Sequence, residues 1–357
     1  MRVLAADVGG THARLAVFRM EGRRGTMIRE ERWPSEEYDG LLPILREFLV
    51  DEVESFDAAC LALAGPVLDG VCRLPNLGWE VEGAELSRKT GIEPLWLIND
   101  FDAVAHGVLL LDENELAVLS EGEGRGTDAR GPGAEEPSGA GAPGRSRADR
   151  ESSSLLAVVG AGTGLGVAAV DPGSDPPRVH GSEGGHTDFA AVTEEEWALA
   201  RFLTRRHERA SWERVLCGDG LVDLYRFLRE AEYAPEVEAV RAAMAEESGG
   251  PAAVVSRHGL AGDDRLSKRA LEVFVSAYGR FAGNVALTLG ARGGVYVAGG
   301  IAPRILDALR EGSFMEAFRS MGRMSDYVAR IPVRVVLQGD VGLLGAASVA
   351  AARASGA

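Results

Sequence analysis

The chain has 357 residues, enough for one or two globular domains with sizeable cores. Its net charge of −16 argues against a nucleic-acid partner, because binding to a phosphate backbone needs a basic face. No apolar run is long enough to cross a bilayer, and the three cysteines form no CxxC pair, which disfavours a disulfide framework or a zinc cluster. With 46% hydrophobic and 26% charged residues, we expect a soluble cytoplasmic α/β protein that binds no membrane.

The first motif is a hairpin closed by a glycine turn. Apolar residues 3–8 and 13–18 predict two strands around Gly9-Gly10-Thr11. Because a strand begins at once, we expect no signal peptide. Glycine lets backbone N–H groups approach an anion closely, and Asp7 stands where it could face a phosphate-bound metal ion. An ordinary glycine hairpin, with Asp7 as a turn residue, explains the same residues equally well.

A second candidate site follows a buried strand in the next part of the chain. Residues 58–64 predict one buried strand, and a loop containing Asn76 and Trp79 leads to a helix at about 84–90. The apolar run 95–98 then ends in Asn99-Asp100, just before helix-like spacing. In open α/β sheets, ligands bind at this edge. Both residues also favour turns and helix N-caps, and on this stretch alone the cap is the simpler interpretation.

Residues 121–150 differ sharply from the rest in composition. They contain no aromatic residue and no aliphatic residue larger than alanine. Such a segment cannot bury enough apolar surface to offset its ordering entropy, so we predict a disordered loop, which also marks a division between two lobes.

The next motif repeats the first. Residues 155–159 and 167–170 predict strands around a glycine turn, and no helix follows, which excludes a GxGxxG dinucleotide fingerprint. Superposing residues 5–18 on residues 157–170 places Gly162 on Gly10 and Thr163 on Thr11. This short internal repeat predicts a duplicated fold that holds a phosphate chain between two glycine turns.

Polar residues with binding potential recur in the last half. Glu183 and His186 lie in a glycine-rich loop, and Glu213 is expected near a helix start, where a first-turn acid is the simpler interpretation. Residues 267–289 predict a long amphipathic helix. The strand after it ends in Gly299-Gly300, which suits close passage of a nucleoside or simply a close-packed turn.

Together these motifs resemble the bacterial glucokinase family, within the hexokinase/actin-like ATPase superfold. The resemblance runs from Asp7 to Ala347 and leaves out only residues 121–150. It implies a duplicated, ribonuclease H-like α/β fold whose two lobes close on D-glucose and ATP. It implies a small lobe at 1–112, a large lobe at 113–339, a helix at about 340–357 that rejoins the small lobe, and a homodimer.

The resemblance also implies roles for individual residues. Asp100 would be the general base that accepts the proton of the sugar 6-hydroxyl. The implied sugar-binding residues are Asn76, Asn99, Asp100, Glu183, His186 and Glu213. The implied ATP-binding residues are Asp7, Gly9, Gly10, Thr11, Gly162, Thr163, Gly164, Gly299 and Gly300, with Asp7 holding Mg²⁺ through water.

The chain departs from the family pattern at three places. His12 replaces the usual asparagine, Cys217-Gly218-Asp219-Gly220 replaces Ser-Gly-Pro-Gly, and residues 121–150 are extra. A ROK-like kinase for N-acetylglucosamine, mannose or fructose is the nearest alternative, but it usually carries a cysteine-rich zinc motif. A sugar-sensing regulator would need a DNA-binding helix-turn-helix. ATP, ADP and polyphosphate all fit anion-binding turns, so the sequence leaves the phosphoryl donor open.

Overall fold

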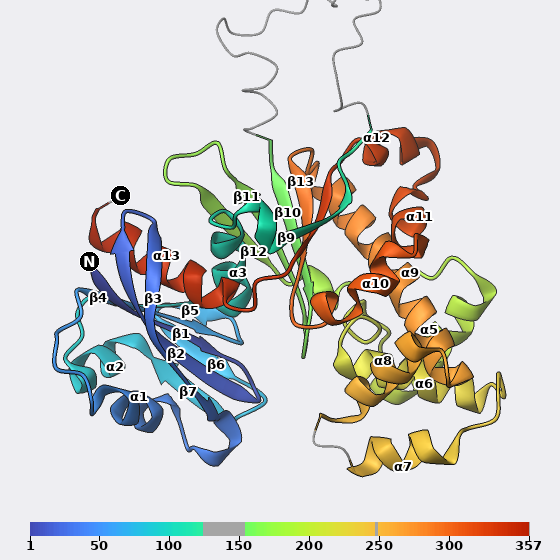
Figure 1. The fold of residues 1–357 in the computed structure, drawn as a ribbon, viewed down its shortest axis with the longest axis horizontal. Helices are drawn as coiled ribbons and strands as arrows, with labels where there is room; N and C mark the ends of the chain where they lie inside the picture. Colours follow the sequence, from blue (N-terminus) through green and yellow to red (C-terminus); the bar gives the residue numbers. More distant parts are fainter. Residues whose placement is uncertain (124–153, 247–248, 357) are drawn as a thin grey trace, which may run out of the picture.

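Two large β-sheets organise the protein (Figure 1). The computed structural model describes residues 1–123, 154–246 and 249–356. The first sheet has the order β3-β2-β1-β4-β8, and the second has the order β12-β11-β10-β13-β14-β9. The first contains β1 (Arg2–Val8), β2 (His12–Glu21), β3 (Arg24–Pro34), β4 (Ala58–Leu63) and β8 (Leu95–Asn99). The second contains β9 (Leu116–Ser120), β10 (Leu156–Ala161), β11 (Leu165–Asp171), β12 (Arg178–Ser182), β13 (Gly294–Ala298) and β14 (Val333–Val336).

The two sheets repeat one pattern of strand pairing. β1 pairs antiparallel with β2 and parallel with β4, and β10 pairs in the same way with β11 and β13. Each pattern ends in a further parallel strand, β8 or β14. The duplicated α/β fold predicted from the two glycine hairpins is therefore confirmed.

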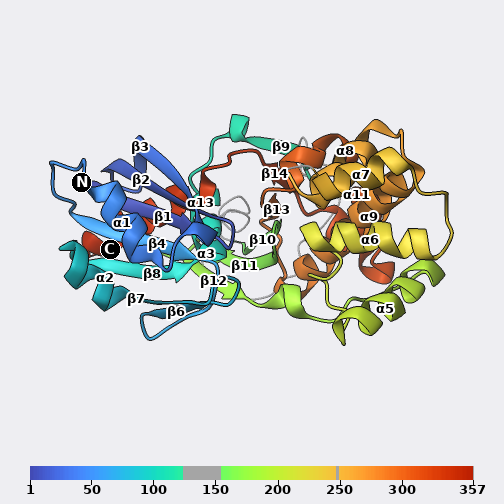
Figure 2. The ribbon, with the colours of Figure 1, turned by 90° about the horizontal axis from the view of Figure 1, so that it is seen from below.

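Helices cover both faces of each sheet. On the first sheet, α1 and α2 pack on one face and α13 on the other, and on the second sheet α3 packs opposite the group formed by α5, α6, α8, α9 and α11 (Figures 1 and 2). The longer helices are α1 (Leu41–Leu49), α2 (Gly83–Thr90), α3 (Asp100–Val108), α5 (Glu194–His207), α6 (Gly218–Glu230), α7 (Glu238–Glu246), α8 (Pro251–Ala261), α9 (Arg265–Leu289) and α13 (Val341–Ala354). The shorter ones are α10 (Leu306–Arg310), α11 (Ser313–Arg319), α12 (Ser325–Ala329) and the 3₁₀ turns η1 (Ser35–Glu37), η2 (Glu113–Glu115), η3 (Gly184–His186), η4 (Ala302–Ile305) and η5 (Gly322–Met324).

α3 and α13 cross at backbone contact. A side chain at Gly107 would clash with the carbonyl of Val341, and one at Gly345 would clash with the carbonyl of Ala103. Each helix follows the last parallel strand of one sheet and packs on the other sheet. The crossing therefore joins the two halves through residues 103–107 of α3 and the first turn of α13. The lobe boundaries at 112/113 and 339/340 stay a prediction.

Several local expectations were wrong. β3 was not predicted, because its exposed positions are charged and mask the alternation of a strand at the sheet edge. Trp79 begins β7 (Trp79–Glu82) of a small sheet with β5 (Val67–Leu68) and β6 (Val71–Leu74), although it was expected in a loop. Gly299-Gly300 leads into the short η4, which continues directly into α10.

The segment 121–150 was predicted to be disordered from its first residue. Its first three residues pack on the second sheet, where Glu121 pairs with Arg334 at 2.9 Å and the N–H of Glu123 donates to Ala329. The remainder of the segment lies outside the described residues. Within the described ranges, no helix is both long and apolar enough to cross a membrane.

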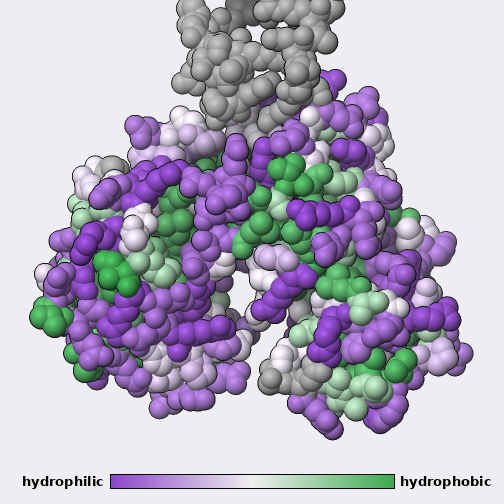
Figure 3. All heavy atoms as spheres, viewed as in Figure 1, coloured by the Kyte–Doolittle hydropathy of each residue, from purple (hydrophilic) through white to green (hydrophobic). Residues whose placement is uncertain are grey.

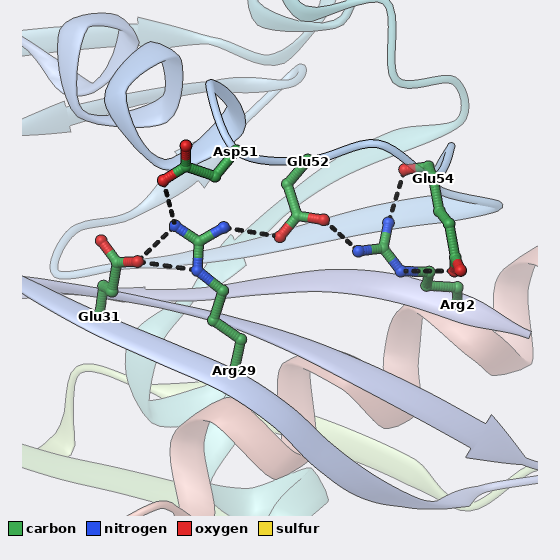
Figure 4. Close-up of polar contacts among 6 residues, drawn as sticks. All are labelled: Arg2, Arg29, Glu31, Asp51, Glu52 and Glu54. Carbon is green, nitrogen blue, oxygen red and sulfur yellow. Dashed lines mark hydrogen bonds and ion pairs between the residues drawn. The ribbon is translucent and has the colours of Figure 1, made fainter.

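An ion-pair network links the start of β1 to β3 and to the loop after α1 (Figure 4). Glu52 accepts from Arg29 at 2.8 Å through one oxygen and pairs with Arg2 through the other. Arg29 also binds Glu31 at 2.7 Å, and Arg2 lies 3.5 Å from Glu54. Only 9% of the Glu52 side chain is exposed, so this carboxylate joins β1, β3 and the loop after α1 from a partly buried position.

Candidate active site

Asn99 and Asp100 lie where β8 ends and α3 begins, at the carboxyl end of the parallel strands β1, β4 and β8. The side-chain oxygen of Asn99 accepts the N–H groups of Phe101 at 2.9 Å and Asp102 at 3.3 Å, so Asn99 is the N-cap of α3. Its amide also donates to the Gly65 carbonyl at 3.1 Å. The cap interpretation is thus confirmed, and one N–H of the amide stays available to a ligand.

Asp100 occupies the first position of α3, directly after the cap. Burial raises the pKa of Asp100 to about 7, and the nearby charge of Asp7 adds to the rise. The N–H of Phe101 donates to Asp100 at 2.9 Å and acts in the opposite direction. A carboxylate with a pKa near the working pH is well suited to act as a general base.

Asp7 lies near the end of β1 in register with Arg14 on β2. Burial raises the pKa of Asp7, and Arg14 only partly offsets this effect. Among the described residues no group of three metal-ligating side chains exists. A single carboxylate beside an anion-binding turn still fits Mg²⁺, which keeps several waters and takes its other ligands from phosphates.

The first glycine turn exposes backbone donors. The Gly9 N–H closes the turn on the His12 carbonyl at 2.9 Å, so the histidine that replaces the family's asparagine supports the turn through its backbone. Ser35 binds the carbonyls of Gly9 and Thr11, each at 3.0 Å. In the described part of the chain, the N–H groups of Gly10 and Thr11 donate to no acceptor, which leaves them free for an anion.

Asn76 lies against this first turn. A Cβ at Gly10 would be 3.3 Å from the Cβ of Asn76, so a side chain at Gly10 would press Asn76 away from the turn by a few tenths of an ångström. The structure therefore places Asn76, which was predicted to bind sugar, beside the first glycine turn.

The second glycine turn is closed by a shorter-range hydrogen bond than the first. The Gly162 N–H closes on the Gly164 carbonyl at 2.9 Å, and the Gly162 carbonyl accepts the N–H of Gly218 at 3.0 Å. Thr163 is exposed at the tip, and its N–H and that of Gly164 find no acceptor among the described residues. Each turn therefore offers two free N–H groups, and of these four donors only those of Thr11 and Thr163 occupy matching positions of the sequence repeat.

Gly299 and Gly300 lie next to this second turn. Gly299 has a φ of +82°, and a side chain there would clash with the carbonyl of Ala161, which ends β10. The N–H of Ile301 donates to the same carbonyl at 3.2 Å. Only glycine satisfies both constraints at 299, whereas a Cβ at Gly300 would meet nothing within 4 Å.

Glu183, His186 and Glu213 form the third part of the site. His186 Nε2 lies 3.6 Å from Glu183, and His186 Nδ1 lies 3.5 Å from Glu213. Glu213 was expected near a helix start, but it lies in a turn that precedes α6, which begins at Gly218. Its N–H donates to the Gly185 carbonyl at 2.9 Å. This bond brings Glu213 to the loop that carries Glu183 and His186, which we call the acid–histidine loop.

Sequence reasoning missed two residues that connect these parts. The ring of Phe101 packs on Gly160 and Gly166, on either side of the second glycine turn, where a side chain at either glycine would strike the ring. Asp102 lies against Gly181 of β12, and burial together with the charge of Glu183 raises the pKa of Asp102. Glycines within β10, β11 and β12 were the available signal for a close neighbour.

The predicted residues thus gather in two groups on opposite halves of the protein. Figure 3 shows the opening between the two halves on one face. No hydrogen bond or ion pair between described residues joins one group to the other, and the start of α3 lies between them. The first group is Asp7, Gly9, Gly10, Thr11, Asn76, Asn99 and Asp100, and the second is Gly162, Thr163, Gly164, Glu183, His186, Glu213, Gly299 and Gly300.

Comparison with known proteins identifies the architecture. The profile of the Glucokinase family matches residues 4–353. A glucokinase of Synechocystis sp. is 38% identical over 98% of this chain and 97% of its own length. The crystal structure of a glucokinase from an Antarctic psychrotroph superposes with a TM-score of 0.74 at 31% identity, covering 98% of both chains.

A more distant structure shares the fold alone. The ROK family glucokinase from Streptomyces griseus, solved with glucose and AMPPNP, has a TM-score of 0.64 at 18% identity, covering 98% of this chain and 99% of its own. These neighbours have the two-lobed actin-like ATPase fold, which confirms the predicted fold class. The match of a family profile over nearly the whole chain, together with these relatives, shows that the chain belongs to the glucokinase family.

Proposed function

We propose that the chain transfers the γ-phosphoryl group of ATP to the 6-hydroxyl of D-glucose, giving glucose 6-phosphate and ADP. The observation that carries this proposal is Asp100, a carboxylate with a pKa of about 7 at the carboxyl end of the parallel strands β1, β4 and β8, in a protein with two glycine turns that have free N–H donors. Relatives of 35–38% identity named glucokinase support the sugar, and a neighbour solved with glucose and AMPPNP supports the donor.

Asp100 would accept the proton of the 6-hydroxyl as the oxygen attacks phosphorus. Such general-base catalysis contributes about 100-fold to 10,000-fold to a rate. The free amide N–H of Asn99 would donate to a neighbouring hydroxyl and hold the sugar beside the base. Because Asn99 also caps α3, its position and that of Asp100 are fixed by the same hydrogen bonds.

The remaining polar side chains would orient the sugar. Glu183 and Glu213 accept hydroxyl protons, and His186 between them can donate or accept. Asn76 offers an amide from the side of the first turn. A site that pairs each hydroxyl discriminates against a sugar lacking one, because its own polar groups would be left unpaired.

The two turns would hold the phosphate chain. The N–H groups of Gly10, Thr11, Thr163 and Gly164, which donate to no acceptor among the described residues, would donate to the phosphate oxygens, and Gly299-Gly300 would border the nucleoside. Mg²⁺, which Asp7 would hold through water, supplies neutralisation of phosphate charge when bound. We also propose a homodimer in the cytoplasm, on family resemblance, and sedimentation velocity of the purified chain tests the dimer.

A coupled assay over a panel of sugars and phosphoryl donors tests the proposal. Glucose with ATP should give the highest kcat/KM, and Asp100→Asn should lower kcat by about 100-fold to 10,000-fold. Asp326→Asn, at an exposed position on α12, is the matched control and should retain full turnover. Near-normal turnover by Asp100→Asn would refute the assignment of the base, and equal use of N-acetylglucosamine would refute the sugar.

A further inference from the structure

One carboxylate contacts the second glycine turn and also faces the acid–histidine loop. Oε2 of Glu213 accepts the N–H of Leu165 at 3.0 Å, and Leu165 begins β11 directly after the turn. A Cβ at Gly164 would lie 2.8 Å from this same oxygen. Oε1 of Glu213 lies 3.5 Å from Nδ1 of His186. One oxygen of Glu213 therefore contacts the second glycine turn, and the other faces the acid–histidine loop.

The backbone around Glu213 makes the same connection. Its N–H donates to the Gly185 carbonyl at 2.9 Å, within the loop that carries His186. Five residues later, the N–H of Gly218 donates to the Gly162 carbonyl at 3.0 Å. Residues 213–218 are thus bonded at one end to the acid–histidine loop and at the other end to the glycine turn.

We propose that Glu213 is a positioning residue that couples sugar binding to nucleotide binding, so that each ligand increases the affinity for the other. This inference rests on the proposed function, in which the loop binds sugar and the turn binds phosphate. A sugar hydroxyl that donates to Oε1 leaves Oε2 free to keep its bond to Leu165, since each carboxylate oxygen accepts more than one hydrogen bond. Holding the Glu213 side chain in one rotamer costs conformational entropy, and this cost is incurred only once when both ligands bind.

This coupling must be reciprocal, because it is a free energy shared by two binding equilibria. Calorimetry with the full chain, Mg²⁺ and AMPPNP should show that saturating glucose lowers the Kd for AMPPNP by a factor of about five or more. Glucose should bind more tightly by the same factor when AMPPNP is saturating. Unchanged affinities in both titrations would overturn the coupling, whereas a complete absence of glucose binding would instead contradict the proposed function.

Two variants with the same chemical change isolate the residue. Glu213→Asp keeps the charge but withdraws the carboxylate from Leu165, and Glu183→Asp does the same to an acid that faces His186 at 3.6 Å without touching the turn. Both variants should bind glucose more weakly. Only Glu213→Asp should reduce the coupling factor to about one, measured at glucose concentrations raised to saturate each variant.

Hydrogen exchange of the Leu165 amide gives a readout that needs no ligand. In the unliganded protein, exchange of this amide should be faster in Glu213→Asp than in the wild type and unchanged in Glu183→Asp. Adding glucose alone should slow it in the wild type. Equal coupling factors in the two variants, or a Leu165 amide indifferent to Glu213→Asp, would overturn the proposal.

Discussion

The negative charge of Asp7 raises the pKa of Asp100 across the carboxyl end of the first sheet. The two residues follow different strands, β1 and β8, which are separated by β4. Burial contributes more than this charge, and together they bring the pKa of Asp100 to about 7. A group that must be deprotonated to accept a proton is then half-active near neutrality.

The rate of phosphoryl transfer should therefore fall in mild acid. Below about pH 7, kcat/KM for glucose should drop about tenfold per pH unit, because only the deprotonated fraction of Asp100 acts as base. Initial rates from about pH 5 to about pH 9 measure this limb. The residual activity of Asp100→Asn should lack it. A wild-type profile that stays flat through pH 6 would show that Asp100 is not the titrating group.

The same raised pKa predicts how stability depends on pH. Asp100 has a pKa of about 7 when folded against 3.8 in a model peptide, so its contribution is fully present below about pH 4 and is lost as the pH rises through 7. Asp100→Asn should therefore be more stable than the wild type at pH 8, by on the order of 2 kcal/mol, and equally stable near pH 4. Urea unfolding at both pH values checks this. A variant less stable than the wild type at pH 8 would contradict it.

Two substitutions separate the roles of Asn99. Asn99→Ala removes the cap of α3 and should cost about 1–2 kcal/mol of stability, because the N–H groups of Phe101 and Asp102 lose their acceptor. Asn99→Asp keeps the acceptor for these N–H groups but loses the donor to the Gly65 carbonyl, so it should recover only part of this loss. Both variants lose the amide N–H and should raise KM for glucose about tenfold. If Asn99→Asp binds glucose normally, the amide has no part in sugar binding.

The features that sequence could predict are those with local signatures. Glycine turns between apolar runs predicted both hairpins, which the structure contains. Asn99 before Asp100 had the residue types of a cap, and it is one. Each of these rests on backbone rules that act over a few residues.

The features that sequence could not predict depend on distant parts of the chain. The pKa of Asp100 depends on Asp7, and the contact of Glu213 with Leu165 depends on how the turn before α6 folds over the second hairpin. The edge strand β3 was missed because its charges find partners elsewhere, such as Arg14 for Glu30 and Glu52 for Arg29. No periodicity within a segment records such pairings.

Gly299 and Gly300 offer a matched test of backbone strain. Gly299→Ala should destabilise the protein by about 1–3 kcal/mol, since its φ is +82° and a Cβ would strike the Ala161 carbonyl. Gly300→Ala meets no atom within 4 Å and should change stability by less than about 0.5 kcal/mol. Thermal unfolding measures both. KM for ATP should rise in Gly299→Ala, because β13 would move away from the second turn. Equal stability of the two variants would contradict this account.

The network around Glu52 should stabilise the first sheet without affecting catalysis. Glu52 lies between Arg2 and Arg29 with 9% of its side chain exposed, so Glu52→Gln leaves two partly buried guanidinium groups less well compensated (Figure 4). The expected loss is about 1–3 kcal/mol of unfolding free energy.

Glu54→Gln is the control: its side chain is 70% exposed and 3.5 Å from Arg2, and exposed pairs contribute less than about 1 kcal/mol. Denaturant unfolding of both variants in low and high salt decides the matter, and kcat should stay at the wild-type value in each, because the network is at the end of the sheet opposite Asp7 and Asp100. Equal losses in the two variants would mean that burial of Glu52 adds nothing to the strength of its ion pairs.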